Sequence, residues 1–245
     1  MPKPPHNIIT IYGRKPVLEA LQQYDLDIFR VHLADSNKAS GIIADIESAC
    51  SKRKIDIQYH DRLALSRISK NKKQDQGVAA DIINPKAIDF QNYIEDCKPN
   101  ARLLAVDRIT NPQNLGMIIR TVTASTLDGI LIPKNGCAKL DALVVKASAG
   151  TVFRSRLIFC ERLEDTLVKA KQKGFAIYGM ALEGARSFYE TTLKEPSIVI
   201  LGNETDGLSE QVKNCCDQLL YIPMQNGVES LNVSVTAGIL AFHQN

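Results

Sequence analysis

In the second half of the chain, short apolar segments alternate with longer segments of helical character, and this alternation constrains the fold more than any other feature. Apolar segments with the length of buried strands lie at 102–107, 129–132, 175–180, 197–202 and 219–222. Helices are predicted at 115–125, 142–148, 163–172, 209–216 and 231–242. Nearly all-apolar strands that are each followed by a helix are typical of a parallel sheet covered on both faces. We therefore predict an α/β fold for this part of the chain.

The first half predicts a second, smaller α/β unit. Helices are expected at 14–23, 38–50 and 61–68, and strands at 28–34, 55–59 and 78–83. Asn84-Pro85 interrupts the chain after these elements, and a helix at 88–97 is expected to end before Pro99. With 245 residues, the chain has room for two domains with cores of their own. The predicted organisation is a domain at 1–80, a linker at 81–98 and a larger domain at 99–245.

Composition excludes several classes of protein. Hydrophobic residues make up 44% of the chain and charged residues 23%, which is typical of a folded globular protein rather than a disordered one. No apolar segment is long enough to cross a membrane. The six cysteines form no C-x-x-C pair, and the four histidines lie at no ligand spacing from them, so no metal site is expected. Free thiols, together with a first segment that has no apolar signal region, indicate a reducing cytoplasm.

Positive charge is concentrated in one segment. The net charge is only +3, but the segment 51–73 contains just two acidic residues, Asp56 and Asp61. Its basic residues are Lys52, Arg53, Lys54, Arg62, Arg67, Lys70, Lys72 and Lys73. A surface that contacts phosphate groups needs such an excess of positive charge. A solvated helix face and loop would give the same pattern, so this segment alone leaves both interpretations open.

Polar, glycine-rich loops follow three of the predicted strands. They are 107–116, which leads to Arg120, then 201–209, and then 222–234. The carboxyl ends of parallel strands meet at one edge of a sheet, where ligands usually bind. Each loop taken singly is also explained as an ordinary turn or helix cap. The patterns G-x-G-x-x-G, G-x-x-x-x-G-K-[ST] and G-x-S-x-G are absent, which argues against dinucleotide-binding enzymes, P-loop enzymes and serine hydrolases.

In this order, the three loops resemble the motifs of the SpoU (TrmH-like) family of RNA ribose 2′-O-methyltransferases. The motifs correspond to Asn111-Pro112-Gln113-Asn114-Leu115-Gly116 with Arg120, to Gly202-Asn203-Glu204 with Asp206-Gly207-Leu208, and to Ile222-Pro223-Met224 with Ser230-Leu231-Asn232-Val233-Ser234. The first half resembles the family's substrate-binding domain through Tyr12-Gly13-Arg14 and Gln76-Gly77-Val78-Ala79. The chain departs from the family at Ala124-Ser125-Thr126-Leu127, where a glycine is usual, and at Thr236 and Gly238, where alanines are usual.

The resemblance implies a SPOUT-type catalytic domain, a parallel-sheet α/β trefoil knot, that forms a homodimer and binds S-adenosylmethionine. Carried over by position, the cofactor contacts are Gly202, Ile222 and Leu231. The catalytic residues implied are Arg120, Asn114, Glu204, Ser230 and Asn232. Because an arginine stays protonated, Arg120 is expected to anchor a phosphate and to lower the proton affinity of the ribose hydroxyl, not to act as a base. Glu204 and Asn232 are equally well explained as residues that order their loops.

The resemblance also changes the interpretation of the basic segment. In a small α/β domain expected to bind RNA, phosphate contacts are predicted for Arg14, Lys52, Arg53, Lys54, Lys70, Lys72 and Lys73. Relatives with this two-domain layout most often resemble enzymes that act on a guanosine of bacterial 23S rRNA, which is the expected substrate, with tRNA as the alternative. A non-catalytic RNA-binding factor for ribosome assembly and a small-molecule methyltransferase are further alternatives. Neither a membrane nor a metal ion is an expected partner.

Overall fold

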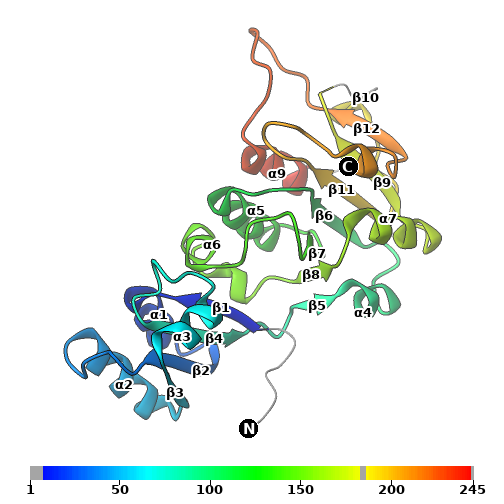
Figure 1. Ribbon diagram of the computed structural model, residues 1–245. Helices are drawn as coiled ribbons and strands as arrows, with labels where there is room; N and C mark the ends of the chain where they lie inside the picture. The colour runs from blue at the N-terminus through cyan, green and yellow to red at the C-terminus, as the bar shows by residue number, and fades with distance from the viewer. Residues whose placement is uncertain (1–7, 183–185, 244–245) are drawn as a thin grey trace. The chain divides into compact units, whose positions relative to one another are not determined.

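The computed structural model describes residues 8–182 and 186–243, and the chain divides into two compact units (Figure 1). The N-terminal unit contains the residues up to Pro85 together with Leu140–Lys146. The C-terminal unit contains Lys86–Lys139 and the residues from Ala147 on. No helix in the described ranges is long and apolar enough to cross a membrane.

In the N-terminal unit, a four-stranded sheet has the order β1-β4-β2-β3. Its elements are β1 (Ile8–Tyr12), α1 (Arg14–Gln22), β2 (Asp27–Ala34), α2 (Ile42–Arg53), β3 (Ile57–His60), α3 (Arg62–Ser69) and β4 (Val78–Ile83), and most of α6 (Ala142–Ala147) belongs here as well. β4 is antiparallel to β1 and β2, whereas β2 and β3 are parallel. Asp61 caps α3 by accepting a hydrogen bond from the backbone N–H of Ala64 at 2.7 Å. Gly41, with a φ of 56°, precedes α2, which begins later than predicted.

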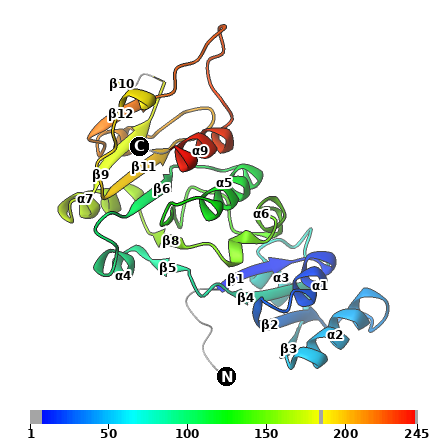
Figure 2. The same ribbon diagram turned by 180° about the vertical axis from the view of Figure 1, so that it is seen from behind.

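The C-terminal unit contains an eight-stranded sheet in which all the strand pairs are parallel, in the order β10-β12-β9-β11-β6-β7-β8-β5. The strands are β5 (Ile88–Asp89), β6 (Arg102–Val106), β7 (Gly129–Pro133), β8 (Leu157–Cys160), β9 (Ala176–Met180), β10 (Arg186–Ser187), β11 (Ser197–Leu201) and β12 (Gln218–Tyr221). One side carries α4 (Phe90–Glu95) and α7 (Leu163–Gln172), and the other carries α5 (Pro112–Ala124) and α9 (Val233–Phe242) (Figures 1 and 2). α8 (Glu210–Lys213) lies on the side of α7, since its Val212 shares an apolar core with Leu167. The predicted parallel sheet with helices on both faces is confirmed.

The central strands of this sheet are buried on both faces. Leu103 and Ala105 of β6 belong to one apolar core together with Phe90 of α4 and Leu167 of α7. Leu104, which points to the opposite face, is buried as well. Double burial explains why the strands of the second half are nearly all apolar in the sequence.

The sequence prediction omits β1, β5, β8 and β10, and it places β5 within a helix expected at 88–97. β8 is an apolar run of four residues between the charged Arg156 and Glu161, and β10 has only two residues, too few to show a strand pattern. The segment 81–98, predicted to be a linker, contains the end of β4, then β5 and α4. β5 pairs with β8, and Phe90 and Tyr93 of α4 are buried. The segment therefore contributes residues to the sheets of both units.

Candidate functional site

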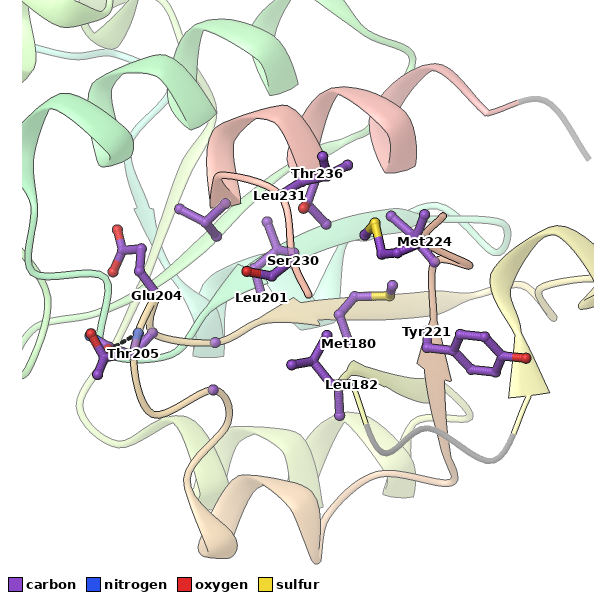
Figure 3. A pocket seen from close by; sticks show the side chains of 16 residues that line it. Met180, Leu182, Leu201, Glu204, Thr205, Tyr221, Met224, Ser230, Leu231 and Thr236 are labelled. Atoms are coloured by element: carbon purple, nitrogen blue, oxygen red, sulfur yellow. Dashed lines mark hydrogen bonds between the residues drawn. The ribbon is translucent and has the colours of Figure 1, made fainter. Parts of the chain in front are cut away.

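A cavity of ≈ 170 Å³ lies at the carboxyl ends of β9, β11 and β12, which are neighbours in the sheet. Glu204 and Thr205 lie on one side of it, and Met224 and Tyr221 on the other (Figure 3). The second and third polar loops of the sequence thus meet at one edge of the sheet, as predicted. The remaining wall residues are Met180, Ala181, Leu182, Leu201, Gly202, Asn203, Gly207, Ile222, Ser230, Leu231, Val233 and Thr236.

The first polar loop reaches this region through the start of α5. Asn111 caps the helix: its side-chain oxygen accepts hydrogen bonds from the backbone N–H groups of Gln113 at 2.8 Å and Asn114 at 3.4 Å. Pro112 occupies the first helical position, where its missing N–H costs little. The cap fixes the direction of the Asn114 side chain, which is buried. Its amide nitrogen donates to Glu204 Oε1 at 2.5 Å, and its amide oxygen accepts from Asn232 Nδ2 at 3.1 Å.

One chain of hydrogen bonds therefore joins Glu204, Asn114 and Asn232, with one residue from each polar loop. Asn232 also caps α9, because its side-chain oxygen accepts from the backbone N–H of Ser234 at 2.8 Å. Asn114 is 90 residues from Glu204 and 118 residues from Asn232, so these contacts hold distant parts of the chain together. Of the three residues, only Glu204 lines the cavity.

The loop after β11 leaves no room for a side chain at Gly202. A Cβ atom at this position would lie 2.3 Å from the carbonyl carbon of Gly207 and 2.5 Å from its oxygen. The loop folds back on itself here, because the backbone N–H groups of Asn203 and Gly207 each donate to the other's carbonyl oxygen, at 2.9 and 3.0 Å. The space that a side chain of residue 202 would need is thus filled by protein and not by a ligand.

The predicted cofactor contacts Gly202, Ile222 and Leu231 all line the cavity. Ile222 is 8% exposed and also belongs to the core, whereas Leu231 is 37% exposed. Met180 and Met224 add further apolar wall. Apolar walls, edged by the backbone of strand ends and by one carboxylate, suit a ligand with a flat heteroaromatic ring and a polar chain. In this respect the residues fit S-adenosylmethionine.

The other predicted catalytic residues lie in different places. Ser230 lines the cavity, but Arg120 does not. Arg120 is exposed on α5, six residues after Asn114, which is about 9 Å further along the helix axis. Within one chain, the structure does not bring Arg120 together with the cavity.

The basic residues predicted to contact RNA fall into two groups. Arg53 is used inside the N-terminal unit, where its guanidinium donates to the carbonyl oxygens of Leu21 at 2.9 Å and Gln23 at 3.1 Å, at the end of α1. Arg14 donates to the carbonyl oxygen of Gln76 at 3.3 Å and to the side-chain oxygen of Asn37 at 3.2 Å. The remaining predicted contacts are exposed: Lys52, Lys54, Lys70, Lys72 and Lys73.

Sequence reasoning missed the residues at the end of β6 that hold the second loop. Asp107 Oδ2 accepts a hydrogen bond from the backbone N–H of Ser209 at 2.6 Å, and Arg108 donates to the carbonyl oxygen of Gly207 at 3.1 Å. Their only signal in the sequence is their position at the end of the predicted strand 102–107, where the first polar loop begins. The loop after β9, where Leu182 lines the cavity, was also missed.

The half-buried thiols near the site are not candidate nucleophiles. Burial raises the pKa of Cys137 to about 11 and that of Cys216 to about 12, so both thiols stay protonated at neutral pH. Cys216 packs against β9, where a Cβ atom at Gly179 would lie 2.7 Å from its sulfur. In residues 8–182 and 186–243, no group of three or more His, Cys, Asp or Glu side chains could hold a metal ion.

Comparison with known proteins identifies the family. The model of the SpoU rRNA Methylase family matches residues 101–242, and the model for RNA 2′-O ribose methyltransferase substrate binding matches residues 10–87. The 23S rRNA (guanosine-2′-O-)-methyltransferase RlmB of Pseudomonas aeruginosa is 30% identical over 95% of this chain and 94% of its own length. A putative TrmH family tRNA/rRNA methyltransferase of Staphylococcus saprophyticus is 32% identical over 96% of this chain and 94% of its own length.

Solved structures share the fold. The SpoU methyltransferase AviRb from Streptomyces viridochromogenes, in complex with AdoMet, has a TM-score of 0.66 and 19% identity, with 96% of this chain and 88% of that chain covered. A putative RNA methyltransferase of the TrmH family from Porphyromonas gingivalis has a TM-score of 0.62 and 26% identity, with the same coverage of 96% and 88%. The predicted SPOUT-type α/β fold is confirmed. The chain belongs to the SpoU rRNA methylase family, and it is a methyltransferase whose N-terminal unit matches the substrate-binding domain of RNA ribose 2′-O-methyltransferases.

Proposed function

We propose that the protein transfers a methyl group from S-adenosylmethionine to a ribose 2′-hydroxyl of RNA, at a guanosine of 23S rRNA. The observation that carries the proposal is the chain of hydrogen bonds Glu204–Asn114–Asn232, which joins the three family motifs beside the cavity that Glu204 lines. The choice of 23S rRNA is supported by the RlmB relative, which is similar over nearly the whole of both chains. In this proposal the protein acts in the cytoplasm, residues 1–80 bind RNA, 81–98 link the two parts, and 99–245 catalyse the transfer.

Methyl transfer to a ribose oxygen is an in-line displacement, so the protein's main tasks are to align the reactants and to help the hydroxyl lose its proton. S-adenosylmethionine supplies the activated methyl group when it is bound. Ile222, Leu231 and the loop that starts at Gly202 hold it in the cavity, and Ser230 adds a polar wall. Arg120, which stays protonated, anchors a phosphate of the RNA and favours the deprotonated hydroxyl electrostatically.

A second copy of the chain completes this site. Arg120 lies outside the cavity of its own chain, on a face of α5 and α9 that also exposes Met117, Val235 and Phe242. The two helices are in contact, since the Ser234 hydroxyl lies 3.9 Å from the Met117 sulfur. Exposed apolar patches of this kind mark interaction surfaces. A homodimer that buries this face carries Arg120 of one copy towards the cavity of the other.

Labelled methyl transfer tests the function. The purified protein is given labelled S-adenosylmethionine with unmodified 23S rRNA or with tRNA, and the modified ribose is mapped. Label at one guanosine ribose of 23S rRNA is the expected result. Label in tRNA alone would support the proposed reaction but would identify tRNA, and not 23S rRNA, as the substrate. If the protein bound RNA but no S-adenosylmethionine, the non-catalytic RNA-binding alternative would replace the proposal.

Arg120→Ala tests the proposed role of that residue. The variant should bind S-adenosylmethionine as the wild type does and should lose at least about a hundredfold in methyl transfer, because one preorganised charge at the reacting oxygen is removed. Arg162→Ala, which removes an exposed guanidinium elsewhere in the C-terminal unit, is the matched control. Equal losses of cofactor affinity and transfer in Arg120→Ala would contradict the role.

A further inference from the structure

Arg108 joins the first polar loop to the second without lining the cavity. It lies two residues after the end of β6 and has a φ of 57°, in the left-handed region that residues other than glycine seldom occupy. Its carbonyl oxygen accepts a hydrogen bond from the side-chain amide of Asn203 at 2.9 Å. Its guanidinium donates to the carbonyl oxygen of Gly207 at 3.1 Å. One residue thus holds both ends of the 203–207 loop.

The loop held in this way is a wall of the cavity. Asn203, Glu204 and Gly207 all line it. The Gly207 carbonyl oxygen also accepts the backbone N–H of Asn203 at 2.9 Å, and it lies only 2.5 Å from the place of a Cβ atom on Gly202. The position of that oxygen therefore sets how closely the loop packs on the end of β11, and Arg108 is the side chain that holds it.

The arrangement has unfavourable features of its own. The Nε atom of Arg108 is buried without a hydrogen-bond partner, and Asp107 Oδ1 lies 3.6 Å away from it. A left-handed backbone and an unsatisfied buried N–H both cost free energy. The contacts that offset these costs are the ones that Arg108 makes with the 203–207 loop, together with the ion pair between its Nη1 and Asp206 Oδ2 at 3.6 Å.

We propose that Arg108 is a positioning residue for the cofactor: it clamps the 203–207 loop and thereby sets the wall on which cofactor affinity depends. The inference rests on the proposed binding of S-adenosylmethionine in this cavity. Because Arg108 holds a loop that forms a wall of the cavity, its loss should raise the Kd and KM for S-adenosylmethionine. Arg108 does not itself line the cavity, so it should take no part in the transfer step. At saturating cofactor, kcat should change little.

The test compares Arg108→Ala, Arg108→Gly and Arg108→Lys in the full-length protein, with calorimetric titration of S-adenosylmethionine and methyl-transfer kinetics. Loss of the guanidinium contacts should raise Kd and KM about tenfold in the alanine variant, with kcat within about twofold of the wild type. Glycine suits the left-handed backbone, so Arg108→Gly should have a higher Tm than Arg108→Ala but the same weakened affinity. Lysine keeps one donor and should recover part of the affinity.

Arg162→Ala is the matched control, since Arg162 and Arg108 line the same neighbouring hollow but Arg162 is exposed and pairs with Glu164. Its Kd should equal that of the wild type. A wild-type Kd in Arg108→Ala would overturn the inference. The inference would also be overturned if Arg108→Gly bound S-adenosylmethionine with the wild-type Kd, because affinity would then depend on stability and not on the guanidinium. Failure of the wild-type protein to bind S-adenosylmethionine would instead overturn the proposed function.

Discussion

The shape of the cavity depends on single residues, and Gly202 is the sharpest case. Gly202→Ala would place a methyl group against the backbone of Gly207, which has no flexible end that can move aside. We expect the 203–207 loop to shift, with a loss of about 1–3 kcal/mol in the free energy of unfolding and a clear rise in the Kd for S-adenosylmethionine. Urea unfolding and calorimetric titration of the same protein measure both effects.

Gly174→Ala is the control for this prediction. Gly174 has a φ of 89° in the turn after α7, but a Cβ atom there would meet nothing within 4 Å. That substitution should lower stability through backbone strain alone and leave the Kd unchanged. An unaltered Kd in Gly202→Ala would show that the loop tolerates the added methyl group.

The sequence indicated which residues belong to the site more readily than what each of them contacts. The motif pattern selected Asn114, Glu204 and Asn232, but their hydrogen bonds join parts of the chain about a hundred residues apart, which local spacing does not encode. Arg53 shows the opposite problem. As one of several basic residues it was predicted to contact RNA, yet its guanidinium binds the carbonyl oxygens at the end of α1. Whether a basic side chain faces solvent depends on tertiary packing.

At the scale of helices and strands, prediction succeeded where burial or a helix cap produces a recognisable pattern in the local sequence. The predicted helix at 163–172 matches α7, and the buried β6, β9, β11 and β12 were found as apolar runs. β10 was missed because a strand of two residues carries too little pattern, whereas β8 was overlooked although its four residues form an apolar run as long as β12. The order of strands in the sheet is set by long connections, and no local signal gives it.

The element that we expect to form the dimer interface is the outer face of α5 and α9. Val235 is 49% exposed near the start of α9, so Val235→Glu would not disturb the core and would suit the positive end of the helix. In a dimer that buries this face, the same carboxylate would lose its hydration on both copies, which costs free energy. We expect a monomer in sedimentation, and a loss of at least about tenfold in methyl transfer.

Val168→Glu provides the comparison for this prediction. Val168 is 48% exposed on α7, on the opposite side of the sheet, and a glutamate there should leave both sedimentation and activity unchanged. A dimeric, active Val235→Glu variant would contradict the proposed interface.

At the scale of the whole molecule, RNA affinity depends on how a small net charge is distributed. The net charge of +3 is too weak to attract RNA by itself, so binding requires the local concentration of exposed lysines in the N-terminal unit. Lys70, Lys72 and Lys73 follow α3 without an intervening acidic residue. In the proposed function they contact the RNA backbone, while the cavity of the C-terminal unit binds the cofactor.

Replacing Lys70, Lys72 and Lys73 by serine should therefore weaken RNA binding without changing the Kd for S-adenosylmethionine. Each phosphate contact contributes nearly one unit to the slope of log K against log salt, so the slope should fall by about 2–3 units. Filter binding across a salt series measures it. The control replaces Lys169, Lys173 and Lys194, three exposed lysines of the C-terminal unit, by serine. It changes the net charge by the same amount and should keep the wild-type slope. Equal effects of the two variants would mean that net charge, rather than a defined lysine surface, governs RNA binding.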